Sequence, residues 1–150
     1  IYELADRYNI PPSLIQLELT ESAFTENTKI LFETMNRLQT NGYYISMDDF
    51  GSGYSSMNML KDEPLDEIKI DRVFLDDISK DKSRSIIKHL ISMISDLGIH
   101  IIAEGVETQE QADFLIECGC LRAQGFYFYK PMPVKEFELL LKQEHTHENC

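Results

Sequence analysis

The chain has 150 residues, of which 43% are hydrophobic, and a formal net charge of −12. This length and composition allow one globular domain with a hydrophobic core, and no stretch approaches the run of about 20 apolar residues that a membrane span needs. The acidic charge argues against a duplex nucleic-acid-binding protein, because such proteins present a basic face to the phosphates.

Five short apolar segments predict strands, and amphipathic patterns between most of them predict helices. In chain order the strands are expected at Leu14–Thr20, Tyr43–Asp48, Glu67–Ile70, His100–Ala103 and Ala123–Phe128. Helices are expected at Thr28–Gln39, at Ser83–Leu97, from Thr108 to about Cys118, and at Val134–Leu141. The alternation predicts an α/β fold with a parallel sheet, and both a (β/α) barrel and an open doubly wound sheet agree with it.

The ends of these helices carry their own signals. Glycines that stop a helix follow the first three, at Gly42, Gly98 and Gly119. Thr108 and Gln111 have the spacing of a capping box that opens the third. The polar tail over residues 143–150 is expected to be flexible.

The cysteines and the first residue indicate the setting of the chain. Cys118, Cys120 and Cys150 are too few for a disulfide framework, so we expect a reducing, cytoplasmic setting and structural thiols at Cys118 and Cys120. The chain starts at Ile1 without a signal-peptide pattern. We therefore expect a segment of a larger protein, which an upstream part could anchor to a membrane.

Acidic residues collect at the carboxyl ends of the first four predicted strands, together with one lysine. The set is Glu18, Asp48, Asp49, Lys69, Asp71, Glu104 and Glu107. The carboxyl ends of parallel strands meet on one side of a sheet, where α/β barrels keep their catalytic sites. Crowded carboxylates repel one another, which predicts bound Mg²⁺ or Mn²⁺. Metal-assisted hydrolysis and enolate chemistry both fit such a site, and the residue types do not separate them.

Five motifs occur in order along the chain. They are Glu18-Leu-Thr-Glu21-Ser22, Asp48-Asp49-Phe-Gly-Ser-Gly-Tyr-Ser-Ser56, Lys69-Ile-Asp71-Arg72, Ala103-Glu104-Gly-Val-Glu107-Thr108 and Gln124-Gly-Phe-Tyr-Phe. Together they resemble the EAL-domain phosphodiesterases of bacterial cyclic di-GMP signalling. The resemblance implies that residues 1–142 are the C-terminal portion of one EAL domain, the last five strands of a TIM-like (β/α)8 barrel with their helices. It also implies hydrolysis of one phosphodiester bond of cyclic di-GMP, giving linear pGpG.

The resemblance further implies a role for each residue of the site. Glu18 is expected to bind the first of two Mg²⁺ or Mn²⁺ ions, Asp48 both of them and Asp49 the second. Glu104 is expected beside the attacking water or its metal, and Lys69 is expected to orient that water or to stabilise the phosphoryl charge, so both are candidates for the general base. Supporting roles are implied for Asp71 beside Lys69 or the second metal, Gln124 at the substrate, Glu107 in organising the site, and Glu21 in holding the loop Phe50–Ser56.

One part of the family pattern is absent from the chain. The Glu-Ala-Leu motif and an asparagine metal ligand do not occur here, and we expect both upstream of Ile1. Because a complete barrel needs about 250 residues, we expect this chain alone to be impaired in catalysis. We also expect its open sheet edges to favour a homodimer or larger self-association.

Two other functions compete with hydrolysis. The first is a cyclic di-GMP receptor without turnover, which the intact acids and lysine of the motifs disfavour. The second is an enolase-like barrel, which explains the site but not the order of the motifs.

Overall fold

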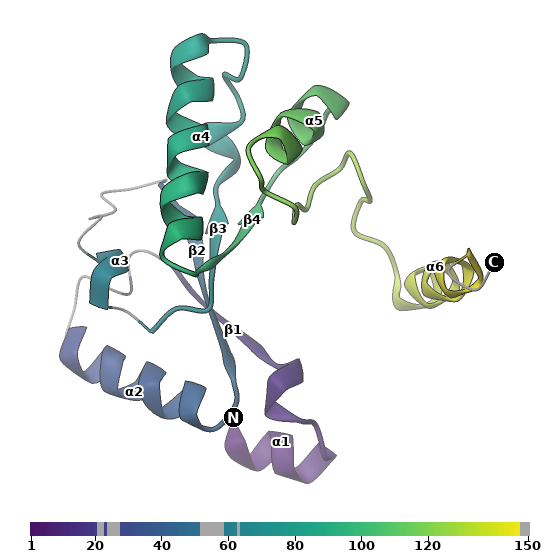
Figure 1. Cartoon of the computed structure of the whole chain (residues 1–150). Coiled ribbons are helices and arrows are strands. Elements are labelled where there is room, and N and C mark those ends of the chain that lie inside the picture. Colours follow the sequence, from purple (N-terminus) through teal and green to yellow (C-terminus); the bar gives the residue numbers. More distant parts are fainter. Residues whose placement is uncertain (21–22, 24–27, 52–58, 63, 148–150) are drawn as a thin grey trace.

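The computed structural model describes residues 1–20, 23, 28–51, 59–62 and 64–147 (Figure 1). The strands of this part are β1 (Gln16–Thr20), β2 (Tyr44–Phe50), β3 (Glu67–Ile70) and β4 (His100–Ala103). The helices are α1 (Tyr2–Tyr8), α2 (Thr28–Thr40), α3 (Met59–Asp62), α4 (Asp81–Asp96), α5 (Gln109–Glu117) and α6 (Val134–His147). Two short 3-10 helices, η1 (Pro12–Leu14) and η3 (Arg72–Phe74), precede β1 and follow β3.

The described strands form one parallel sheet in the order β1-β2-β3-β4. Each strand therefore lies beside its neighbour in sequence, and the helices between them are crossover connections. A doubly wound sheet reverses its strand order at the point where a ligand binds, and no such reversal occurs among these strands. The order is that of a barrel wall.

The predicted fifth strand, Ala123–Phe128, is wrong in extent. The segment makes a single parallel bridge, between Ala103 and Ala123. Beyond Ala103 the neighbouring chain leaves the extended conformation at Gly105, whose φ is +66°. Val106 still donates to the Gln124 carbonyl and accepts from the Tyr127 N–H, but these bonds do not continue the strand pairing. After Gln124 the segment itself folds into a turn over residues 126–128. The side chain of Gln124 is nevertheless carried to the edge of the sheet where β4 ends.

Alternate residues of the sheet face opposite environments, as the period of two predicts. The apolar face joins one core with the helices, and its buried members are Ile45, Met47, Ile68, Ile70, Ile101 and Ala103. Helix α4 contributes Ile87, Leu90, Ile91 and Ile94 to the same core. The opposite face carries the polar residues of the strands, including Ser46, Glu67 and Lys69, which are buried.

The helix ends mostly follow their sequence signals. Gly98 follows α4 with φ +74°, and Thr108 and Gln111 form the capping box of α5. The last helix was expected to end at Leu141 and instead continues to His147. Helix α1 was not predicted; Asn9, at φ +50°, ends it. Helix α6 stands apart from the sheet at the end of an extended connection (Figure 1).

The helices and the cysteines bear on two of the sequence expectations. No helix in the described part of the chain is long and apolar enough to cross a bilayer. Cys120 is buried and Cys118 half-buried, and both are free thiols whose pKa values are raised by burial. Cys150 lies outside the described residues.

The α4 interface generates a stability prediction. Ile94 is fully buried against the sheet, whereas Ile86 of the same helix is 59% exposed. Ile94→Ala is expected to lower the free energy of unfolding by about 3 kcal/mol, since it removes buried carbon and leaves a cavity. Ile86→Ala is the matched control, expected within about 0.5 kcal/mol of the wild type. Urea unfolding followed by circular dichroism measures both, and equal losses would contradict this packing.

Candidate active site

The site is built around the ammonium group of Lys69. This side chain lies on the polar face of β3 and is buried. Its Nζ lies 2.7 Å from Glu104 Oε1, 3.0 Å from Asp48 Oδ1 and 3.1 Å from Glu18 Oε1. These three carboxylates come from β1, from β2 and from the residue after β4. The structure thus brings together four of the predicted residues from four consecutive segments of the sheet.

Asp49 joins the group through an irregularity in β2. Successive residues of a regular strand point to opposite faces, so Asp48 and Asp49 would diverge. The pairing between β2 and β3 shifts register between Met47 and Phe50, and Asp49 adopts the left-handed conformation with φ +55°. Such a bulge re-aims a side chain. Carboxylate oxygens of Asp48, Asp49 and Glu104 consequently lie within 4.8 Å of one another.

The electrostatics follow from this crowding. Burial lowers the pKa of Lys69, but hydrogen bonds with Glu104, Asp48 and Glu18 outweigh it and raise that pKa above its ordinary value. Burial raises the pKa of Glu104; Lys69 opposes that shift, while Asp48 and Asp49 add to it. For Asp49, burial and the carboxylates of Asp48 and Asp71 raise the pKa. The acids carry more negative charge than one ammonium neutralises.

The donor set suits a hard divalent cation. Among the described residues, Asp48, Asp49 and Glu104 are the one group of acids, histidines and cysteines close enough to share a metal ion. All of their donors are carboxylate oxygens, which Mg²⁺ and Mn²⁺ prefer, whereas zinc sites favour histidine and cysteine. The excess negative charge described above supplies the electrostatic attraction for a cation.

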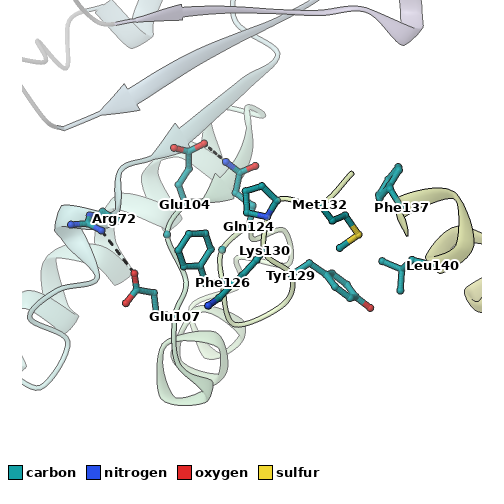
Figure 2. Close-up of a pocket in the computed structure, with 13 residues that line it drawn as sticks. Arg72, Glu104, Glu107, Gln124, Phe126, Tyr129, Lys130, Met132, Phe137 and Leu140 are labelled. Atoms are coloured by element: carbon teal, nitrogen blue, oxygen red, sulfur yellow. Dashed lines mark hydrogen bonds and ion pairs between the residues drawn. The ribbon is translucent and has the colours of Figure 1, made fainter. Parts of the chain in front are cut away.

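A cavity of about 530 Å³ opens beside Glu104 (Figure 2). Gln124 lies at its edge and donates a hydrogen bond from Nε2 to Glu104 Oε1 at 2.5 Å. In Figure 2, Glu104 and Gln124 lie between Arg72 and Glu107 on one side and Phe137 and Leu140 of α6 on the other. The remaining walls combine rings and apolar chains with cations, and include Arg72, Phe126, Tyr129, Lys130 and Met132. A ligand with both phosphate and planar apolar parts would find partners for each here.

The remaining predicted residues lie at the margin of this group. Asp71 accepts a hydrogen bond from the Val73 backbone N–H at 2.7 Å and interacts with Asp49. The ion pairs of Lys69 among the described residues are with Glu18, Asp48 and Glu104, and Asp71 is not one of them. Glu107 lies at the cavity rim, its Oε1 3.9 Å from Arg72 Nη1, with both side chains exposed. Glu21 and residues 52–58 of the predicted loop lie outside the described residues.

A second polar layer on the same face was missed by the sequence reasoning. Glu67, two residues before Lys69 and therefore in phase with it, is 2% exposed. It accepts hydrogen bonds from Gln16 Nε2 at 2.6 Å and Arg122 Nη1 at 3.2 Å. Glu67 is the first residue of β3, so it lies at the amino-terminal end of the strand, whereas the Lys69 cluster lies toward the carboxyl end. The sequence signal that could have identified Glu67 was an acidic residue in phase with Lys69. Its burial and its bonds to Gln16 and Arg122 indicate a structural role.

Comparison with known proteins identifies relatives of the chain. The family model described as the EAL domain matches residues 1–131. The cyclic di-GMP phosphodiesterase RocR of Pseudomonas aeruginosa is 38% identical over 138 residues, which are 91% of this chain and 35% of RocR. The chain spans no more than 35% of the length of the first curated relatives that it matches.

Solved structures agree with the fold. The phosphodiesterase PaMucR of Pseudomonas aeruginosa, in a c-di-GMP complex, superposes with a TM-score of 0.83 at 36% identity, over 91% of this chain and 56% of that chain. A manganese/cy-diGMP complex of BlrP1 from Klebsiella pneumoniae has a TM-score of 0.77 at 30% identity, over 84% of this chain and 33% of that chain. The predicted fold class, part of a TIM-like barrel, is confirmed.

Removal of the central ammonium is expected to destabilise the metal-free chain. Lys69→Met leaves Asp48 and Glu104 without their cation, and breaking a buried ion pair of this kind costs about 3 kcal/mol at pH 7. The loss is expected to shrink near pH 4, where protonation relieves the repulsion. Urea unfolding at both pH values in a chelating buffer measures it. Lys80→Met, which removes an exposed ion pair with Asp77, is the control, and equal effects of the two changes would contradict the central role of Lys69.

The ionised carboxylate of Asp49 is expected to lower the folding stability of the metal-free chain and to strengthen the binding of a metal ion. Because its pKa is raised in the folded chain, ionisation costs stability as the pH rises through that pKa. Asp49→Asn keeps a side chain that tolerates the left-handed backbone and removes this cost. We expect a higher melting temperature for the variant at pH 7 without metal, no advantage at low pH, and a smaller stabilisation by Mn²⁺. Thermal scans against an Asp113→Asn control, at an exposed position, test this, and an unchanged Mn²⁺ response would refute it.

Proposed function

The chain belongs to the EAL domain family, and we propose that it forms part of a metal-dependent phosphodiesterase that converts cyclic di-GMP to linear pGpG. The observation that carries the proposal is the convergence of Asp48, Asp49 and Glu104 around Lys69 at the carboxyl ends of the strands. Relatives that share this family and fold include RocR, a cyclic di-GMP phosphodiesterase, and PaMucR, solved as a c-di-GMP complex.

In this proposal the carboxylates hold two Mg²⁺ or Mn²⁺ ions. Glu18 would contribute to the first, Asp49 to the second and Asp48 to both, with Glu104 next to them. The manganese/cy-diGMP complex of BlrP1 supports a divalent metal in this family. Bound ions of this type lower the pKa of water and stabilise charge on phosphoryl oxygens.

Lys69 and Glu104 would have different roles in the reaction. The raised pKa of Lys69 keeps its amine protonated at neutral pH, so it acts as a hydrogen-bond donor and a source of positive charge. Glu104 is the better proton acceptor, because its carboxylate offers free electron pairs at the cavity, whereas a protonated amine offers none. Of the two candidates for the general base, the geometry and charge therefore favour Glu104, with Lys69 stabilising the negative phosphoryl group.

Substrate binding would use the cavity beside Glu104. Gln124, held by its hydrogen bond to Glu104, is placed to donate to or accept from a ligand at the cavity mouth. Phe126 and Tyr129 line the same space with Lys130 and Arg72, which suits planar bases joined to phosphates. Asp71 and Glu107 would act through Asp49 and Arg72 respectively.

A receptor without turnover is the second candidate. The chain covers 56% of the PaMucR phosphodiesterase chain, so the rest of that domain has no counterpart within these residues. A cluster that binds metal but lacks further groups would bind cyclic di-GMP and leave it intact. We therefore propose that this chain by itself hydrolyses cyclic di-GMP slowly or not at all.

The test uses this chain and a chimera in which it replaces the matching segment of PaMucR. Each is incubated with cyclic di-GMP and Mn²⁺, and linear pGpG is followed by chromatography. We expect the chimera to produce pGpG, to stop when EDTA removes the metal and to recover when Mn²⁺ is restored. A folded chimera that binds cyclic di-GMP without producing pGpG would favour the receptor.

Glu104→Gln in the chimera tests the proposed base. The change preserves shape and the bond from Gln124 but removes the proton acceptor, so kcat is expected to fall by about 10³-fold. Glu110→Gln, at an exposed position of α5, is the matched control and is expected to leave kcat unchanged. Nearly normal kcat in Glu104→Gln would exclude Glu104 as the base.

A further inference from the structure

The short helix η3 contacts the chain at two points, Gly51 directly after β2 and Gly105 two residues after β4. It begins directly after Asp71, whose carboxylate accepts a hydrogen bond from the Val73 N–H at 2.7 Å. The backbone N–H of Phe74 also donates to the Asp71 carbonyl at 3.1 Å. The same Asp71 carboxylate interacts with Asp49. Helix η3 is thus tied to β3, the strand that carries Lys69.

On one side, η3 contacts the chain that follows Asp49. Gly51 has φ +93°, and a Cβ atom built there would overlap the ring of Phe74. The ring therefore lies directly on the backbone two residues after Asp49. Phe74 is half-buried and packs against the main core as well as against Gly51.

On the other side, η3 contacts the chain that follows Glu104. Gly105 has φ +66°, and a Cβ atom there would overlap the Cβ of Arg72 and crowd its side-chain stem. The guanidinium end of Arg72 reaches Glu107, 3.9 Å away. Arg72 and Phe74 therefore touch the backbone on either side of the carboxylate cluster, each at a glycine.

We propose that η3 is the positioning element of this site: Phe74 holds the Asp48–Asp49 bulge through Gly51, and Arg72 holds Glu104 through Gly105. The two contacts set the separation of carboxylates that come from non-adjacent strands. Phe74 is a positioning residue, whereas Arg72 combines this role with its place in the wall of the cavity. The link to metal binding rests on the proposed function, whereas the positioning itself does not require it.

The first experiment measures positioning in the metal-free chain. Backbone hydrogen exchange is compared for Phe74→Leu, which keeps apolar bulk but loses the flat ring, and Phe32→Leu, a partly buried phenylalanine of α2 elsewhere on the core. Phe74→Leu is expected to accelerate exchange over residues 45–51 beyond any change in Phe32→Leu. Equal exchange in the two variants would overturn the proposal.

A second pair of variants isolates the contact from backbone strain. Gly51→Ala and Gly119→Ala place alanine at φ +93° and φ +87°, but a Cβ at Gly119 meets nothing within 4 Å. Gly51→Ala is expected to lower the melting temperature more than Gly119→Ala, and the excess is expected to disappear when Phe74→Ala is added. If the excess remains in the double variant, Phe74 does not hold Gly51.

Metal affinity then connects positioning to function. Mn²⁺ binding is measured by electron paramagnetic resonance of the free ion at a temperature where all variants are folded. Phe74→Leu is expected to weaken binding about tenfold relative to Phe32→Leu, the effect usual for residues that orient metal ligands. Equal Mn²⁺ affinities would overturn the role in metal binding. Altered exchange without pGpG formation by the chimera would instead sustain the positioning role and refute the proposed function.

Discussion

A buried ammonium surrounded by carboxylates is the interaction on which the rest of this site depends. Lys69 is in contact with acids from three other segments of the sheet, at 2.7 to 3.1 Å. A buried lysine without partners would lose its charge, and the acids without the lysine would repel one another. The pKa values of Glu104 and Asp49 are raised first by burial and then by the neighbouring carboxylates. Three acids in contact with a single ammonium also leave net negative charge. That residual charge is the physical basis for a cation at this place.

One face of the parallel sheet carries two layers of polar residues, one around Glu67 and one around Lys69, and their surroundings differ. At the start of β3, Glu67 is buried and accepts hydrogen bonds from Gln16 and Arg122. At the end of the strand, Lys69 meets acids that remain partly accessible. The separation follows the general division of α/β barrels, in which stability is concentrated at one end of the strands and chemistry at the other.

Glycines next to the acids allow the backbone to pack closely around the site. Gly51 and Gly105 accept Phe74 and Arg72, and Gly125, which follows Gln124, lies against the backbone of Val106. Each of these glycines follows a residue of the site by one or two positions. Close packing of this kind limits the movement of the side chains beside it. The carboxylate cluster adjoins the cavity that extends toward α6.

Much of this protein could be predicted from its sequence because the signals are local. The apolar alternation predicted the four strands β1 to β4, and the phase of Glu18, Asp48 and Lys69 predicted that they share one face. Helix ends at Gly98 and Thr108 depend on a few neighbouring residues and were likewise predicted. The five ordered motifs predicted the EAL family, whose model matches residues 1–131.

Only the tertiary structure decided how these elements meet. Ala123–Phe128 has the composition of a strand, but it makes a single parallel bridge, at Ala123, and then turns over residues 126–128. The bulge that turns Asp49 toward Asp48 depends on register between β2 and β3, and the burial of Glu67 depends on Arg122, which is 55 residues away. Local periodicity determines which face a side chain takes, whereas contacts between segments distant in sequence depend on how the strands and loops pack together.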